Sequence, residues 1–244
     1  MADLHLEVVD DTPTLDRVAA DVVADALRAN PAATVVPATG ETPLGLYAEL
    51  ATRRRRGGLD ATDVSIVQLD EYLGLAPGDR RSLFGWMHRT VLEPLGVADD
   101  RVARLPTDGD VPAACASFDR DLEDAGGIDL AILGLGDNGH LGFNEPPCLA
   151  AAPTRVVELT ARTIEANARY WGSIGDVPTR AVTLGLAPLL SAAAIVLLVS
   201  GERKREIVHR ALEGPVGEDV PASFLRHSGA DVSVIVDRAA WGAS

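Results

Sequence analysis

The chain has 244 residues, of which 47% are hydrophobic, and a formal net charge of −14. This acidity excludes a typical nucleic-acid binder, whose surface is basic, although a few gathered cations still allow an anionic small molecule to bind. No apolar run reaches the roughly 18–20 residues that cross a bilayer. The acidic N-terminus lacks the features of a signal peptide. Two cysteines in no metal-like spacing complete a pattern that predicts a reduced, cytoplasmic protein without a metal site.

Short β-branched runs alternate with amphipathic helical stretches, a pattern typical of a parallel sheet with helices on both faces. A helix is predicted at Leu15–Arg28, where apolar residues recur on one side. Arg53–Arg56, followed by two glycines, predicts a helix C-terminus. The predicted strands are Leu4–Val9, Thr34–Val36, Ser65–Leu69, Leu130–Leu133, Ala181–Leu184, Ile195–Val199 and Val232–Val236. We therefore predict an α/β fold, a doubly wound, mostly parallel, Rossmann-like sheet that forms a single domain over residues 1–244.

The turn after the second predicted strand is a candidate phosphate site, because ligands of such sheets bind at the carboxyl ends of the strands. It carries Thr39, Gly40, Glu41 and Thr42 just before a helix begins. Free backbone N–H groups and the positive end of the helix dipole suit a phosphate there. The Gly-Lys-Thr ending of a nucleotide-binding loop is missing. A Gly- and Thr-rich turn without a binding role is an equally good interpretation of this feature alone.

Asp70 directly follows the predicted strand Ser65–Leu69. A carboxylate at the mouth of the crevice is partly buried, and burial raises its pKa toward that of a useful base. An aspartate that only caps the next turn is the competing interpretation, and it is about as common.

The densest polar stretch follows Leu130–Leu133. Four glycines within residues 134–146 allow the backbone to approach a ligand closely, and they frame Asn138, His140 and Glu145. A histidine moves protons near neutral pH, and Glu145 is suited to hold its tautomer and orientation. A dinucleotide site is excluded, because no G-x-G-x-x-G opens a helix in the first βαβ unit. The stretch favours a functional histidine over a buried structural one.

Two cations complete the set of candidates, Arg169 and Lys204. Lys204 is the one lysine among the 22 basic Lys and Arg residues, and it follows the predicted strand Ile195–Val199. Arginine would serve a surface role equally well, so this position favours a packed pocket that requires a compact ammonium.

Six motifs occur in order along nearly the whole chain: T-G-x-T-P at 39–43, L-D-E-Y-x-G-L at 69–75, M-H-R at 87–89, N-G-H-x-G-F-N-E-P at 138–146, A-N-A-R-Y at 166–170 and S-G-x-x-K at 200–204. Together they resemble the glucosamine-6-phosphate deaminases of the glucosamine/galactosamine-6-phosphate isomerase group, which share a fold with 6-phosphogluconolactonases. The resemblance implies that residues 39–42, Arg169 and Lys204 hold the 6-phosphate of an amino sugar. It also implies a lid at 148–175.

The resemblance further assigns the catalytic roles. His140, oriented by Glu145 and Asn138, would open the sugar ring by moving a proton between O1 and O5. Asp70 would then move the proton from C2 to C1 through a cis-enolamine. Hydrolysis of the resulting iminium would give a ketose phosphate and ammonia with no metal or other cofactor, because the amine of the substrate is the electron sink.

Some positions depart from the family pattern. Glu41 stands where Gly or Ser is usual, so its carboxylate either points away from the phosphate or weakens its binding. Asn138 replaces the aspartate of some members, and an amide orients His140 without sharing its proton. The residues after Asn-Glu-Pro lack the usual serines and basic side chains, and the chain ends near Ser244 without the C-terminal extension of allosteric members. These two features lead us to expect a non-allosteric enzyme.

Three alternatives remain at this point. A galactosamine-6-phosphate deaminase differs only in the C4 hydroxyl of its substrate. A 6-phosphogluconolactonase needs the phosphate pocket and the histidine but neither Asn-Glu-Pro nor Asp-Glu-Tyr, both of which are present. A sugar-phosphate-sensing regulator carries a helix-turn-helix appendage, for which we expect no room in 244 residues. The expected partner is a small sugar phosphate, without nucleic acid or membrane and with a homo-oligomer left open.

Overall fold

The computed structural model describes residues 3–76 and 78–242. The strands are β1 (Asp3–Val9), β2 (Thr34–Pro37), β3 (Ser65–Val67), β4 (Asp70–Tyr72), β5 (Val102–Ala103), β6 (Leu130–Gly134), β7 (Arg155–Glu158), β8 (Arg180–Thr183), β9 (Ala194–Val199) and β10 (Asp231–Asp237). The α-helices are α1 (Thr12–Ala29), α2 (Leu44–Arg55), α3 (Leu83–Met87), α4 (Glu93–Leu95), α5 (Val111–Asp124), α6 (Ala161–Trp171), α7 (Leu186–Leu190), α8 (Arg205–Glu213) and α9 (Arg238–Trp241). Shorter helical turns, π-helical in the first case and 3₁₀ in the others, cover His88–Leu92, Asp99–Arg101, Ile174–Asp176, Glu202–Lys204 and Pro221–His227.

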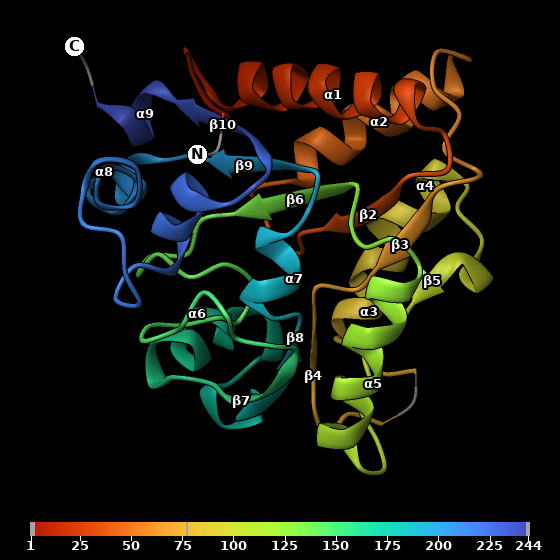
Figure 1. The fold of residues 1–244 in the computed structure, drawn as a ribbon, viewed down its shortest axis with the longest axis vertical. Coiled ribbons are helices and arrows are strands. Elements are labelled where there is room, and N and C mark those ends of the chain that lie inside the picture. The colour runs from red at the N-terminus through yellow and green to blue at the C-terminus, as the bar shows by residue number, and fades with distance from the viewer. Residues whose placement is uncertain (1–2, 77, 243–244) are drawn as a thin grey trace.

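The described residues form a seven-stranded parallel sheet in the order β1-β10-β9-β6-β2-β3-β5 (Figure 1). Successive side chains of a strand point to opposite faces, and β6 supplies both cores in this way. Ala131 and Leu133 pack into one apolar cluster with α7 and α8, whereas Leu130 and Ile132 pack into another with α1 and α2. The doubly wound, mostly parallel fold is therefore confirmed.

The two helical predictions agree with the structure. The helix predicted at Leu15–Arg28 is α1, which begins three residues earlier because the side chain of Asp11 accepts a hydrogen bond from the Thr14 N–H at 2.9 Å. The predicted helix C-terminus is the end of α2. There Gly57 adopts a φ of +73° and donates its N–H to the carbonyl of Arg54, as a glycine cap does.

A second, antiparallel sheet in the order β4-β8-β7 corrects two predictions. The run Ala181–Leu184 does form a strand, but in this small sheet and not in the parallel one. The run Ser65–Leu69 ends its pairing in the large sheet at Val67, and the chain then enters β4. Asp70 consequently lies inside a short strand, opposite Thr183, and not in a loop beyond one. A run of strand-forming residues does not indicate which of two sheets the strand joins.

The segment expected to be a lid, residues 148–175, contains α6 and also β7, which is an edge strand of the small sheet (Figure 1). The sequence analysis missed β7, whose side chains are only partly buried and so show no strong apolar pattern. None of the helices within residues 3–76 and 78–242 is long and apolar enough to cross a membrane.

Candidate active site

A cleft of about 620 Å³ lies at the carboxyl ends of β2, β6 and β9 and is bordered by α6. Its lining includes every residue that the sequence analysis selected except Glu145, namely Thr39, Gly40, Glu41, Thr42, Asp70, Asn138, His140, Arg169 and Lys204. Residues far apart in the chain thus share one site, as expected for residues that follow the carboxyl ends of neighbouring parallel strands.

The turn after β2 leads into α2 without a side-chain cap at Pro43. Gly40 has a φ of +99°, a conformation that favours glycine, and space is open around its Cα. The Glu41 side chain extends toward α6, where its Oε2 lies 3.0 Å from Nη2 of Arg169. Glu41 therefore pairs with one of the two cations expected to hold the phosphate.

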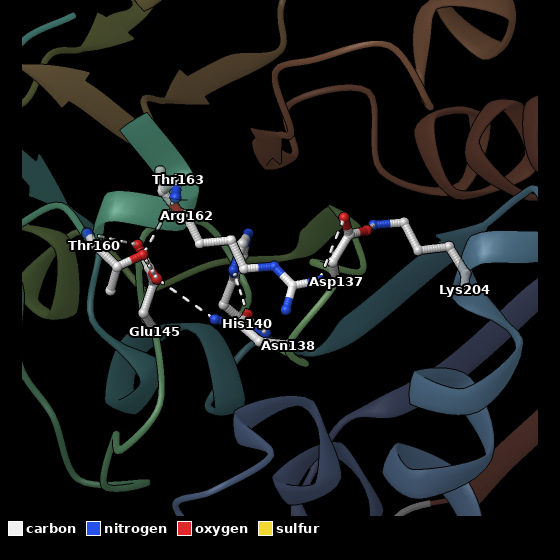
Figure 2. A network of polar contacts seen from close by, with 8 residues as sticks. All are labelled: Asp137, Asn138, His140, Glu145, Thr160, Arg162, Thr163 and Lys204. Atoms are coloured by element: carbon white, nitrogen blue, oxygen red, sulfur yellow. Dashed lines mark hydrogen bonds and ion pairs between the residues drawn. The ribbon is translucent and has the colours of Figure 1, made fainter. Parts of the chain in front are cut away.

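Lys204 is paired in the same manner with Asp137, at the start of the loop after β6. Only 17% of the lysine side chain is exposed, which agrees with a packed ammonium. Burial opposes ionisation of Asp137, but the hydrogen bond and charge of Lys204, with help from Arg203 and Arg162, keep the pKa of this carboxyl below its usual value. Arg162 reaches across from α6, and its Nη2 lies 3.9 Å from Asp137 Oδ2 (Figure 2).

The cleft is locally basic although the chain is acidic. Its lining carries three carboxylates, Glu41, Asp70 and Asp137, against seven cations. These are Arg80, Arg81, Arg89, Arg162, Arg169, Arg203 and Lys204. Only Arg169 and Lys204 were assigned a role from the sequence. Arg89 belongs to the M-H-R motif at 87–89 but was given no role there, and the other four stand at no specified motif position. Such a cluster attracts an anion despite the global charge.

Asp70 is buried, with 4% of its surface exposed. Burial, together with the charge of Glu71, raises the pKa of Asp70 to about 7, and only a 3.4 Å hydrogen bond from the Thr39 hydroxyl opposes this rise. The neighbouring Glu71, and not Asp70, binds backbone N–H groups: it accepts from Leu83 and Phe84 in the first turn of α3, whose N-cap is Ser82. Asp70 is thus left as a titratable carboxyl facing the cleft.

The imidazole of His140 is held in a defined orientation. Its Nδ1 lies 2.7 Å from Oδ1 of Asn138, and a Cβ at Gly136 would overlap the ring. Burial lowers the pKa of His140 to about 4, and the charges of Lys204 and Arg162 act in the same direction against that of Glu145. The ring is therefore neutral at pH 7. With Nδ1–H donated to Asn138, Nε2 is left as a proton acceptor.

Glu145 reaches the histidine indirectly. The Asn138 amide donates to Glu145 Oε2 at 3.4 Å, so the hydrogen-bonded path from Glu145 to His140 runs through Asn138 (Figure 2). From the sequence, Glu145 and Asn138 were both expected to orient His140, but it was not predicted that Asn138 lies between Glu145 and the imidazole. It also missed Thr160, whose hydroxyl donates to Glu145 at 2.6 Å, because the two lie 15 positions apart in an unremarkable stretch.

The arrangement supplies acid–base chemistry beside an anion site. Asp70 exchanges a proton near pH 7, His140 accepts one at Nε2, and the surrounding cations neutralise a bound anion. Among the residues that the structure describes, no three His, Cys, Asp or Glu side chains are grouped as a metal ion would require.

Comparison with known proteins shows which family the chain belongs to. Residues 12–234 match the family model described as glucosamine-6-phosphate isomerases/6-phosphogluconolactonase. The chain belongs to this family. Within the glucosamine-6-phosphate isomerase/6-phosphogluconolactonase family, it is 39% identical over 231 residues to the glucosamine-6-phosphate deaminase of Bacillus velezensis, with 93% of this chain and 95% of the relative covered. It is 41% identical over 242 residues to that of Streptomyces coelicolor, with coverages of 97% and 91%.

Solved structures of the family share the fold. A monomeric glucosamine-6-phosphate deaminase superposes with a TM-score of 0.92 at 36% identity, and the match covers 97% of this chain and 98% of that one. The 6-phosphogluconolactonase of Trypanosoma brucei superposes with a TM-score of 0.76 at 18% identity, with 98% of each chain covered. The lactonase match shows a common fold and no more.

Proposed function

We propose that this chain is a glucosamine-6-phosphate deaminase, which converts D-glucosamine 6-phosphate and water to D-fructose 6-phosphate and ammonia. The observation that carries the proposal is Asp70, a buried carboxyl with a pKa of about 7 that lines the same cleft as a neutral histidine and seven cations. A carbon acid needs such a base, because proton transfer is most effective near the working pH. The relatives at 39% and 41% identity bear the name of this activity.

The phosphate of the substrate binds the turn that contains Thr39 and Thr42, because the backbone N–H groups and the positive dipole end at the start of α2 favour an anion there. Arg169 and Lys204 supply the cations. Each is paired with a carboxylate in the structure, Arg169 with Glu41 and Lys204 with Asp137. The phosphate dianion therefore exchanges for, or inserts beside, an internal carboxylate when it binds.

Ring opening is the task of His140. Its Nε2 takes the proton of the O1 hydroxyl and returns it to O5 as the C1–O5 bond breaks, which leaves an aldehyde at C1. Asn138 holds the tautomer required for this step, since its carbonyl accepts Nδ1–H.

Asp70 then moves hydrogen from C2 to C1. The ionised carboxylate removes the C2 proton while the aldehyde oxygen O1 takes a proton from solvent water, which gives an enolamine with a hydroxyl at C1. The carboxylic acid formed at Asp70 then protonates C1. The nitrogen lone pair forms the C=N bond of an iminium at C2. Water adds to C2 and ammonia leaves, which gives the ketose phosphate. A pKa near 7 makes both halves of this shuttle feasible at neutral pH.

We further propose that residues 148–175 act as a lid. Two arginines of α6, Arg162 and Arg169, extend to carboxylates on the loops that follow the strands. These side chains connect α6 to the opposite side of the cleft, and a bound phosphate would contact them.

The test is an assay of the purified chain, without added metal, on glucosamine 6-phosphate, galactosamine 6-phosphate and 6-phosphogluconolactone. We expect stoichiometric ammonia and fructose 6-phosphate from the first substrate. Ammonia from the galacto substrate alone would replace the proposal with the galactosamine-6-phosphate activity. Lactone hydrolysis without release of ammonia from either amino sugar would overturn it.

A further inference from the structure

Thr160 joins two parts of the molecule through one hydroxyl group. Its Oγ1 donates to Glu145 Oε2 at 2.6 Å and accepts from the Thr163 N–H at 3.2 Å. The second bond makes Thr160 the N-cap of α6. A hydroxyl has a single proton, and while its oxygen caps the helix that proton is directed to Glu145. The backbone N–H of Thr160 approaches the other carboxylate oxygen, Oε1, at 3.5 Å.

From Glu145 the hydrogen bonds continue to the histidine. Oε2 of Glu145 accepts from the Asn138 amide, and the carbonyl of the same amide faces Nδ1 of His140 at 2.7 Å (Figure 2). The side-chain path therefore runs from the first turn of α6 to the imidazole through two intermediates. Each member has a defined donor and acceptor, so the orientation of each fixes that of the next.

The direction of the Asn138 amide decides the tautomer of His140. The carbonyl must point to Nδ1 for the imidazole to keep its proton there and leave Nε2 as the acceptor. The carboxylate of Glu145 holds the amide in this direction, because it accepts only from the NH₂ side. Thr160 in turn fixes the carboxylate. If α6 moves away, Glu145 loses this donor, and the amide is then held mainly by the longer bond of 3.3 Å that its carbonyl accepts from the backbone N–H of His140.

We infer that Thr160 is a positioning residue that makes the proton-accepting tautomer of His140 dependent on the placement of α6. Its catalytic consequence rests on the proposed deaminase activity, whereas its effect on the imidazole does not. The ionisable groups that act on His140 are Glu145, from its own loop, Asp137, also from that loop, Arg162 from α6 and Lys204 before α8. Replacing Thr160 by the neutral side chain of serine or valine leaves these four charges unchanged and adds none, whereas an aspartate adds a carboxylate beside Glu145.

Three variants separate positioning from simple helix capping. Thr160→Ser retains both hydrogen bonds. Thr160→Val has nearly the same shape and loses both. Thr160→Asp keeps an oxygen that caps α6 but has no proton for Glu145 when ionised. We expect near wild-type activity for the serine variant, and for Val and Asp a fall in kcat of about tenfold or more, typical of lost outer hydrogen bonds, with KM for glucosamine 6-phosphate changed much less. Asp110→Ala, which removes the N-cap of α5 away from the cleft, controls for loss of a cap.

The final measurement determines the tautomer of the His140 imidazole and does not require catalytic turnover. Nitrogen NMR of the ring, assigned by comparison with His140→Gln, is expected to show the Nδ1-protonated tautomer in the unsubstituted chain and in Thr160→Ser, and a mixture of tautomers in Thr160→Val. An unchanged tautomer and an unchanged KM and kcat in Thr160→Val, with only a lower unfolding temperature, would overturn the inference and leave Thr160 as a cap. If the unsubstituted chain releases no ammonia but the tautomer still shifts, the proposed function fails and the positioning role stands.

Discussion

Glu41 and Arg169 form an ion pair across the cleft, with Oε2 of the first 3.0 Å from Nη2 of the second. One belongs to the turn after β2 and the other to α6, so the pair joins the proposed phosphate turn to the proposed lid. Both side chains are more than half exposed. Water screens such a pair, which makes it weak enough for a phosphate dianion to displace.

Glu41→Gln is expected to strengthen substrate binding. The variant removes a competing anion while the glutamine keeps the shape of the side chain. Because an exposed ion pair is worth roughly 0.2–1 kcal/mol, KM for glucosamine 6-phosphate should fall about 1.4-fold to fivefold in steady-state assays. Glu49→Gln, an equally charged change at an exposed position of α2, is the control. Equal KM values for the two variants would show that Glu41 does not compete with the phosphate.

Asp70→Asn is expected to abolish exchange of the C2 hydrogen with solvent while substrate still binds. The same variant tests the raised pKa. A carboxyl whose pKa is about 7 in the folded chain and 3.8 in the unfolded chain keeps its proton better when folded. Its contribution to stability is present below pH 3.8 and is lost as the pH rises through 7.

Asp70→Asn should therefore stabilise the chain at pH 8 by on the order of 2–4 kcal/mol, and by less at pH 5. Urea unfolding at the two pH values measures this difference, and Asp124→Asn on the exposed side of α5 is the reference. A parallel expectation is that kcat/KM of the unsubstituted chain rises as the pH passes through about 7. Exchange at C2 that survives in the asparagine variant would reject the shuttle role.

Gly136→Ala is expected to displace the imidazole of His140. The added Cβ would overlap the ring, although the φ angle of this glycine is not in the left-handed region. We expect a fall in kcat of about 100-fold, the size that a shift of 1 Å in a catalytic group produces. Gly229→Ala is the matched control, because that position lies outside the cleft lining and has open space for a Cβ. Similar kcat values for both alanine variants would contradict the close packing of Gly136 on His140.

Lys204→Arg is expected to weaken phosphate binding although the charge is kept. The ammonium is packed against Asp137 with 17% of the side chain exposed, and a guanidinium is larger and planar. KM should rise about tenfold with a smaller effect on kcat. Arg205→Lys, an exchange in the opposite direction on the exposed surface of α8, should leave both constants unchanged. A Lys204→Arg enzyme with the KM of the unsubstituted chain would mean that any cation suffices.

Local sequence patterns were sufficient to predict the parallel α/β sheet and the strand ends that line the cleft. Apolar runs such as Leu130–Leu133 and Ile195–Val199 are local signals, and a strand of a buried parallel sheet is apolar along its whole length. The glycine-rich segment around His140 could also be recognised as a candidate site, because all of its glycines and polar residues lie within a few positions of one another. These local patterns were enough to select Asp70, His140 and Lys204.

How these residues act on one another follows from the packing of the folded chain. The pKa of Asp70 near 7 depends on burial in a strand that pairs with β8, more than 100 positions away. The ion pair of Glu41 and the hydrogen bond from Thr160 to Glu145 likewise join separate segments. Electrostatic and hydrogen-bond energies depend on distances of a few ångströms in space. No spacing along the chain encodes those distances until the strands and α6 have packed together.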